Sequence, residues 1–290
     1  NATIAGGQFI ETTSHANLAD GSTVIDAKGN LLIPGLHDHH THLIAYAASL
    51  VSINCGPPNV ASEADLKSAL RAQPGRHWLR GTGHHESVSG HLDRQWLDTW
   101  APDRPIRIQH RSGRLWILNS LGMEIIAKSA VSMTPHEQDR LTNEDGRLYD
   151  VDELLGKLTR SEMPPVKLAS QQLAAFGVTG INDMTPSNNA ETWQWFSELQ
   201  ASQDLLQKVR MSGRPALGRC QRTPRLFVGE TKVHLHDSSL PDFGDFVSTI
   251  TESHEKQRNV AVHCVTEVEL VYTLSAFRAA STLAGDRIEH

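Results

Sequence analysis

The chain has 290 residues, of which 39% are hydrophobic and 21% charged, a composition typical of a globular protein with one large domain or two ordinary ones. Its 27 basic and 33 acidic residues give a net charge of −6, so we expect neither a nucleic-acid-binding protein nor one held on an anionic membrane. No apolar stretch approaches the roughly 20 residues that span a bilayer. The three widely spaced cysteines favour a reducing compartment, by default the cytoplasm.

Residues 1–30 contain short strand-like pieces separated by turn residues. Dipeptides typical of tight turns occur at Gly6-Gly7, Asp20-Gly21 and Gly29-Asn30. We therefore predict a small β appendage, part of a β-sandwich, followed by the main domain over residues 31–290.

In the main domain, short runs rich in β-branched residues alternate with amphipathic stretches. The predicted strands are Leu31–Leu36, Trp78–Gly81, Pro105–His110, Val178–Asp183, Thr231–Leu235, Val260–Cys264 and Arg287–His290. The predicted helices are Glu63–Ala72, Val166–Phe176, Glu191–Val209, Phe243–Gln257 and Glu267–Ala280. This alternation predicts an α/β fold with a parallel sheet and right-handed crossovers. The polar segment Thr134–Tyr149 is predicted to be a surface excursion or a lid over the active face.

Sixteen histidines are present, and several of them cluster beside predicted strands. His40 and His42 follow Pro34-Gly35 at the end of the first predicted strand of the main domain. In an extended chain, alternate residues point to the same side, so both imidazoles can bind one zinc ion without a bend in the backbone. His37 and His39 share the spacing and could compete as ligands, but we expect them to support the site or the structure.

Two segments resemble the amidohydrolase superfamily of metal-dependent hydrolases. Val24–Leu43 is similar to the start of the barrel in that superfamily, in which the two histidines after Pro-Gly bind metal and match His40 and His42. Pro105–Ser120 resembles the amidohydrolase 3 branch, which includes proteins like N-substituted formamide deformylase. The resemblance implies a TIM-like (β/α)8 barrel.

The resemblance also implies further metal ligands. Lys232 matches the lysine that carbon dioxide converts to a carbamate bridging two metals, while His263 and His290 match the histidines of the fifth and sixth barrel strands. A carbamate is reasonable, because an unpaired ammonium in a barrel strand is costly to bury. Alternatively, Lys232 lies at a strand edge and reaches solvent, and His234 or His236 is the ligand or its supporting donor.

The second and third barrel strands are predicted at Pro105–His110 and Val178–Asp183. His110 would then face the site and either contact the substrate or its oxyanion, as a catalytic residue, or merely pack. Arg111 and Arg114 could meet an anionic substrate group or simply be solvated. Weaker candidates for the site are His84, His85 and Glu86.

The resemblance predicts, in addition, a catalytic aspartate at the end of an eighth strand, whereas the sequence stops at His290, after the sixth. We therefore expect this chain to be an incomplete barrel whose last strands lie in a further C-terminal segment.

The predicted function is hydrolysis of a non-peptide, amide-like carbon–nitrogen bond of a small molecule by a metal-activated water. One or two divalent ions, zinc by preference, would serve as cofactor. Two alternatives stay open: a mononuclear, deaminase-like enzyme whose Lys232 is unmodified, and a non-catalytic metal-binding or truncated scaffold. The sequence is compatible with a homo-oligomer.

Overall fold

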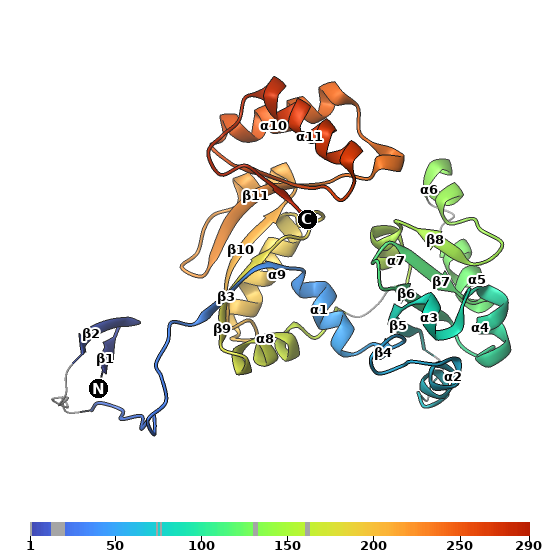
Figure 1. Ribbon diagram of the computed structural model, residues 1–290, viewed down its shortest axis with the longest axis horizontal. Helices are drawn as coiled ribbons and strands as arrows, with labels where there is room; N and C mark the ends of the chain where they lie inside the picture. Colours follow the sequence, from blue (N-terminus) through green and yellow to red (C-terminus); the bar gives the residue numbers. More distant parts are fainter. Residues whose placement is uncertain (1, 13–20, 74, 76, 130–132, 160–162) are drawn as a thin grey trace. The chain divides into compact units, whose positions relative to one another are not determined.

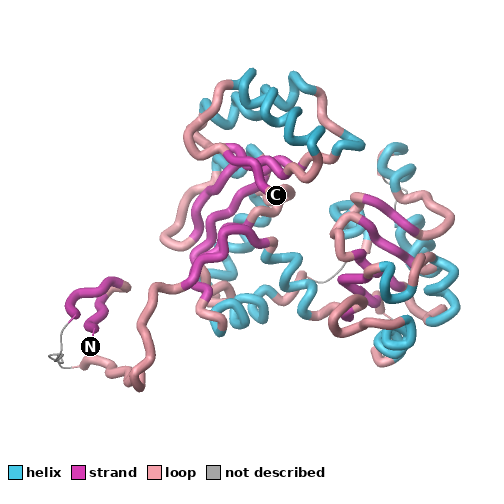
Figure 2. The backbone as a smooth tube through the Cα atoms, in the orientation of Figure 1, coloured by secondary structure: helices cyan, strands magenta, loops and turns pink. Residues whose placement is uncertain are grey.

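A parallel sheet of six strands organises the C-terminal half of the chain and includes one strand from near the N-terminus. The computed structural model describes residues 2–12, 21–73, 75, 77–129, 133–159 and 163–290. All neighbouring strands in this sheet run parallel, in the order β13-β12-β11-β10-β9-β3 (Figures 1 and 2). The strands are β3 (Leu36–Thr41), β9 (Val178–Asp183), β10 (Lys208–Gly213), β11 (Leu226–His234), β12 (Val260–His263) and β13 (Arg287–Glu289).

Amphipathic helices bury the apolar side of this sheet in two clusters. Met211 and Ile181 of the strands pack with Phe196 in one cluster, and Val260 packs with Ile250 in the other. The helices and short 3-10 turns are α1 (Leu43–Leu50), α8 (Val166–Ala175), α9 (Ala190–Ala201), η2 (Pro215–Arg219), η3 (Asp237–Ser239), α10 (Phe243–Glu255) and α11 (Glu267–Ala280). Parallel strands joined through helices confirm the predicted α/β class. A closed eight-stranded barrel stays a prediction.

A second sheet lies in the chain between α1 and α8. Its order is β4-β5-β6-β7-β8, with β4, β5 and β6 parallel and β7 and β8 antiparallel to their neighbours. The strands are β4 (Ile53–Asn54), β5 (Leu79–His84), β6 (Ile106–His110), β7 (Leu115–Leu118) and β8 (Arg147–Tyr149). The helices are α2 (Glu63–Arg71), α3 (Glu86–Ser89), α4 (Arg94–Trp100), α5 (Ser120–Ser129), α6 (Pro135–Arg140) and α7 (Asp152–Leu158).

By its contacts, the chain divides into residues 1–35 and residues 36–290. The first unit contains a hairpin of β1 (Ala2–Ala5) and β2 (Gln8–Thr12), turned at two glycines with positive φ, Gly6 and Gly7. Nowhere in the described residues is there a helix long and apolar enough to cross a membrane.

The strand predicted at Leu31–Leu36 is wrong in its position. Pairing begins only at Leu36, whose N–H donates to the carbonyl of Gly177, and the strand runs on to Thr41. Pro34 has no N–H to offer a sheet, and Leu31 is 91% exposed. His40 therefore lies inside the first strand of the large sheet, and His42 lies just past its end.

The helix predicted over Glu191–Val209 is also too long. It ends at Ala201, Gln203 adopts a left-handed conformation, and β10 follows. Val209 and Met211 alternate with polar residues and are buried in the core, which is the pattern of a strand rather than of a helix end.

The assignment of Pro105–His110 as the second barrel strand is wrong. This segment forms β6 of the second sheet, whereas β9 pairs directly with β3 and β10 comes next. Thr134–Tyr149 is not simply a surface excursion either, because it contributes an edge strand, β8, and buries Leu141 and Leu148.

Candidate metal centre

The carboxyl-terminal ends of four parallel strands bring a series of imidazoles together. Successive ring centroids lie 5.4 Å apart for His42–His40, 5.0 Å for His40–His290, 4.5 Å for His290–His263, and 4.1 Å for His263–His234. The ring of His236 lies 4.4 Å from that of His234. We call these six residues the histidine row: His42, His40, His290, His263, His234 and His236.

The strand register explains why residues so far apart in sequence meet. His234 of β11 is directly paired with His263 of β12, and His263 is paired with Glu289 of β13. In a parallel sheet, carboxyl ends meet at one edge, which is where an α/β protein presents its active face. Pairing between strands therefore brings two local His-x-His motifs, His40/His42 and His234/His236, together with His263 and His290.

Lys232 lies beside the row, two residues before His234 on β11. Its side chain is only 2% exposed, and its amine contacts the carboxylate of Glu289. Burial lowers the pKa of Lys232, against the opposing effect of Glu289. The same carboxylate lies 3.4 Å from Nδ1 of His40 and also pairs with Arg287.

The surroundings of four histidines in the row favour neutral imidazoles. Burial, followed by the positive charge of neighbouring rings, lowers the pKa of His234 to about 3 and that of His263 to about 4. Burial is also the main cause of the lowered pKa values of His40 and His42. A neutral imidazole keeps a lone pair, which is what a metal ligand needs.

The chemistry of the row suits a divalent cation, but its side chains do not converge on a single position. Among the described residues, no hydrogen bond engages the rings of His234, His263 or His290, so their nitrogens are available. His42 Nδ1 lies 3.1 Å from the hydroxyl of Thr185. Nowhere in the described ranges do three His, Cys, Asp or Glu side chains form a ready coordination group. The imidazole nitrogens suit a metal ion, and binding one requires these side chains to move closer together.

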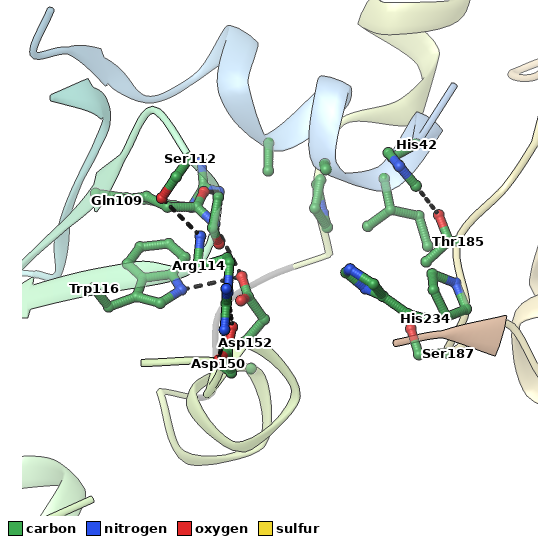
Figure 3. Close-up of a pocket in the computed structure, with 18 of the residues that line it drawn as sticks. His42, Gln109, Ser112, Arg114, Trp116, Asp150, Asp152, Thr185, Ser187 and His234 are labelled. Carbon is green, nitrogen blue, oxygen red and sulfur yellow. Dashed lines mark hydrogen bonds and ion pairs between the residues drawn. The ribbon is translucent and has the colours of Figure 1, made fainter. Parts of the chain in front are cut away.

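A large pocket of about 2020 Å³ opens above this edge of the sheet. Its lining includes all five residues predicted to bind metal: His40, His42, Lys232, His263 and His290. Figure 3 shows His42 and His234 on one side of the pocket, and on the other Gln109 and Trp116 of the second sheet together with Asp152 of α7.

His110, the other predicted catalytic residue, is placed elsewhere. It ends β6, with Nε2 3.0 Å from Glu86 and Nδ1 2.9 Å from the Ser112 hydroxyl, and does not line the pocket. The centroid of its ring lies 6.2 Å from that of His84 and 6.0 Å from that of His85. The structure therefore collects a second histidine cluster in the second sheet, separate from the histidine row.

The remaining candidates also fall outside the row. His37 is exposed, with Nε2 3.0 Å from Asn182 Oδ1, and its ring lies 4.7 Å from that of His39, so this pair sits on the other side of β3. Arg111 is exposed and does not line the pocket. Arg114 lines it but is held by Asp150 through two hydrogen bonds of 2.9 and 2.8 Å.

Sequence reasoning missed two acidic residues at this edge. Glu289 joins Lys232 to His40, and its position beside His290 in a strand was the available clue. Asp183 is fully buried at the end of β9, where its carboxylate accepts hydrogen bonds from the N–H groups of Leu43 and Thr185. Asp183 thereby fixes the turn that follows His42.

Comparisons with known proteins agree with this architecture. Residues 23–290 match the model of the amidohydrolase family. Among solved structures, the chain is similar to two uncharacterized metal-dependent hydrolases: one from Pyrococcus horikoshii OT3 (TM-score 0.63, 18% identity) and one from Pyrococcus furiosus (TM-score 0.60, 19% identity). Both similarities cover 89% of this chain, and 58% and 60% of the respective structures.

Two curated relatives match about half of the chain. The N-substituted formamide deformylase of Arthrobacter pascens is 26% identical over 143 residues, and Protein LONG AFTER FAR-RED 3 of Arabidopsis thaliana is 25% identical over 142 residues. Each match covers 46% of this chain, but only 26% and 24% of the two relatives. The resemblance inferred from the motifs is thus confirmed at the level of the family.

Proposed function

The chain belongs to the amidohydrolase family, and on that premise we propose that it hydrolyses an amide-like carbon–nitrogen bond in a small molecule with the help of a divalent metal. The observation that carries this proposal is the histidine row, with Lys232, at the carboxyl-terminal edge of a parallel sheet and on the wall of a large pocket. Fold alone does not assign a reaction, so the proposal rests on this site.

The ligands proposed for the metal are His40, His42, Lys232, His263 and His290. A divalent ion held by these residues would lower the pKa of a water molecule and would polarise a carbonyl group. Zinc is our first choice because neutral imidazoles dominate the donor set, and the three free cysteines, two of them buried, lie outside the row.

Lys232 is proposed to react with carbon dioxide. Its neutral amine would attack the carbon of CO2 and release a proton, leaving a carbamate whose oxygens are anionic donors. Such a carbamate would face the carboxylate of Glu289, which contacts the amine in this structure. Two anions in contact need positive charge between them, so we expect carbamate formation and metal binding to occur together.

The contact between Lys232 and Glu289 favours a second candidate function. If the lysine remains an ammonium paired with Glu289, the imidazoles would hold one ion, as in a mononuclear, deaminase-like enzyme. Metal content separates the two proposals: the carbamate version binds two ions and loses activity when CO2 is removed, whereas the ion-paired version binds one and is indifferent to CO2.

The metal assignment can be tested with a matched pair of double variants. His40→Ala/His42→Ala should abolish stoichiometric metal in elemental analysis of the purified full-length protein. His37→Ala/His39→Ala removes two histidines at the same spacing on the same strand, but exposed ones, and should keep the metal. Full metal content in the first variant would refute the assignment. Hydrolysis assays on formamides, amides and cyclic ureas then test the bond type.

A further inference from the structure

The side of the pocket formed by the second sheet carries a pair of adjacent arginines. Arg80 comes from β5 and Arg107 from the neighbouring β6, and the two are in register with each other. Both line the pocket. Their guanidinium carbons lie 5.3 and 5.4 Å from the centre of the Trp116 ring. The same indole therefore makes a cation–π contact with both arginines. We call Arg80, Arg107, Gln109 and Trp116 the arginine recess.

The positive charges of the arginine recess are electrostatically unfavourable where they lie. Arg107 is only 7% exposed, and burial together with the nearby charge of Arg80 lowers its pKa to about 10. Arg80 donates to two neutral acceptors, the Ser52 hydroxyl at 2.5 Å and Gln109 Oε1 at 3.5 Å. In the described part of the chain, Arg80 takes part in no ion pair. A bound anion would offset this electrostatic cost.

The acidic residues around the recess indicate how much negative charge it accepts. Asp152 receives hydrogen bonds of 3.0 Å from both Gln109 and Trp116, and so borders the recess with one carboxylate. Arg114 and Asp150 neutralise each other nearby. The carboxylate of Asp152 would repel a second negative charge on a bound molecule, which favours a monoanion over a dianion.

We propose that the arginine recess binds a carboxylate of the substrate, so that the molecule hydrolysed is an amide-like compound bearing a carboxylate. The planar guanidinium fork of Arg80 matches the two oxygens of a carboxylate. The inference rests on the proposed function only in taking the bound molecule to be the substrate, because the histidine row lines the same pocket.

Calorimetry with a charged probe and its neutral isostere tests this proposal. Phenylacetate should bind the full-length protein about tenfold more tightly than phenylacetamide, since the two differ in charge but hardly in shape. Inorganic phosphate, mainly a dianion at pH 8, should bind more weakly than phenylacetate. Equal binding of the two phenyl probes, or tighter binding of phosphate, would overturn the proposal.

Substitutions identify the residue whose charge causes the preference for phenylacetate over phenylacetamide. Arg80→Gln should reduce the preference to less than about twofold, because the carboxylate loses its bidentate partner. Arg111→Gln makes the same charge change at an exposed position outside the pocket and should keep the full preference. Arg80→Lys keeps the charge without the fork and should show an intermediate preference, which provides a test even if the glutamine variant does not fold. An unchanged preference in either Arg80 variant contradicts the recess.

The metal-site variant separates this inference from the proposed function. His40→Ala/His42→Ala should still prefer phenylacetate, since neither residue belongs to the recess. Loss of the preference in that variant, with retention in Arg80→Gln, would place the carboxylate on the metal. The recess would then be wrong while the metal assignment stood.

Discussion

Two of the histidine clusters in the described residues differ in their surroundings, and we propose a metal site for only one of them. In the histidine row, rings from β3, β11, β12 and β13 meet along a pocket wall, and those of His234, His263 and His290 make no hydrogen bond within the described residues. In the second cluster, the ring nitrogens are largely engaged: His84 Nε2 lies 3.0 Å from the Ser89 hydroxyl, and His110 contacts both Ser112 and Glu86. Clustering alone is therefore a weak criterion, whereas unengaged nitrogens at the ends of several parallel strands are a strong one.

The largest expected difference between the clusters is in metal affinity. His263→Ala should weaken zinc binding by more than about 100-fold, because even the loss of outer-shell partners commonly costs 10–100-fold. His110→Ala should leave the affinity unchanged. Competition with a chromophoric chelator measures both. If the two variants lose zinc to the same extent, the distinction between the clusters fails.

The glutamates of the two clusters should also differ. Glu289 is 11% exposed and contacts Lys232, which is buried, so Glu289→Gln leaves an uncompensated charge and should lower the free energy of unfolding by about 3 kcal/mol. Glu86 pairs with His110 at the surface with half of its side chain exposed, so Glu86→Gln should cost less than about 1 kcal/mol.

Urea denaturation of the metal-free protein measures these two costs. The double variant Glu289→Gln/Lys232→Met should recover most of the loss, because it removes both buried charges. A cost for Glu289→Gln no larger than that for Glu86→Gln would show that the pair with Lys232 is solvated.

The second cluster should also make stability dependent on pH. Burial is the main cause that lowers the pKa of His84 to about 4, and His84 Nδ1 has no hydrogen-bond partner among the described residues. The unfolded chain therefore binds a proton near pH 6.5 that the folded chain does not bind. The resulting stability is present above pH 6.5 and is lost as the pH falls towards 4, by up to about 3 kcal/mol.

Replacing His84 tests this dependence. His84→Gln should flatten the decline in the urea midpoint between pH 6.5 and 4, whereas replacement of the exposed His39 should not. Parallel acid profiles of His84→Gln and wild type would contradict a neutral, buried His84.

Local features of the sequence predicted much of the large sheet. The helix Glu267–Ala280 was predicted correctly, and in the structure Thr266 and Glu269 form a capping box at its start. The ligand positions His40, His42, Lys232, His263 and His290 were placed through the family resemblance, and the structure brings them to one pocket wall.

The second sheet could not be derived in this way. Ile106 and Ile108 alternate as in any strand, and nothing local tells which sheet such a strand joins, because pairing is set by distant segments. For the same reason, neither the Lys232–Glu289 contact nor the pairing of Arg80 with Arg107 could be read from the sequence. Both depend on the register between strands.

X-ray absorption spectroscopy of the zinc-loaded, full-length protein tests the central claim most directly. We expect a first shell of nitrogen and oxygen only, with histidine scattering and distances of about 2.0–2.1 Å, because imidazoles of the row supply most of the ligands. A sulfur ligand at about 2.3 Å would instead place the zinc on a cysteine such as Cys264, and the histidine row would not be the metal centre.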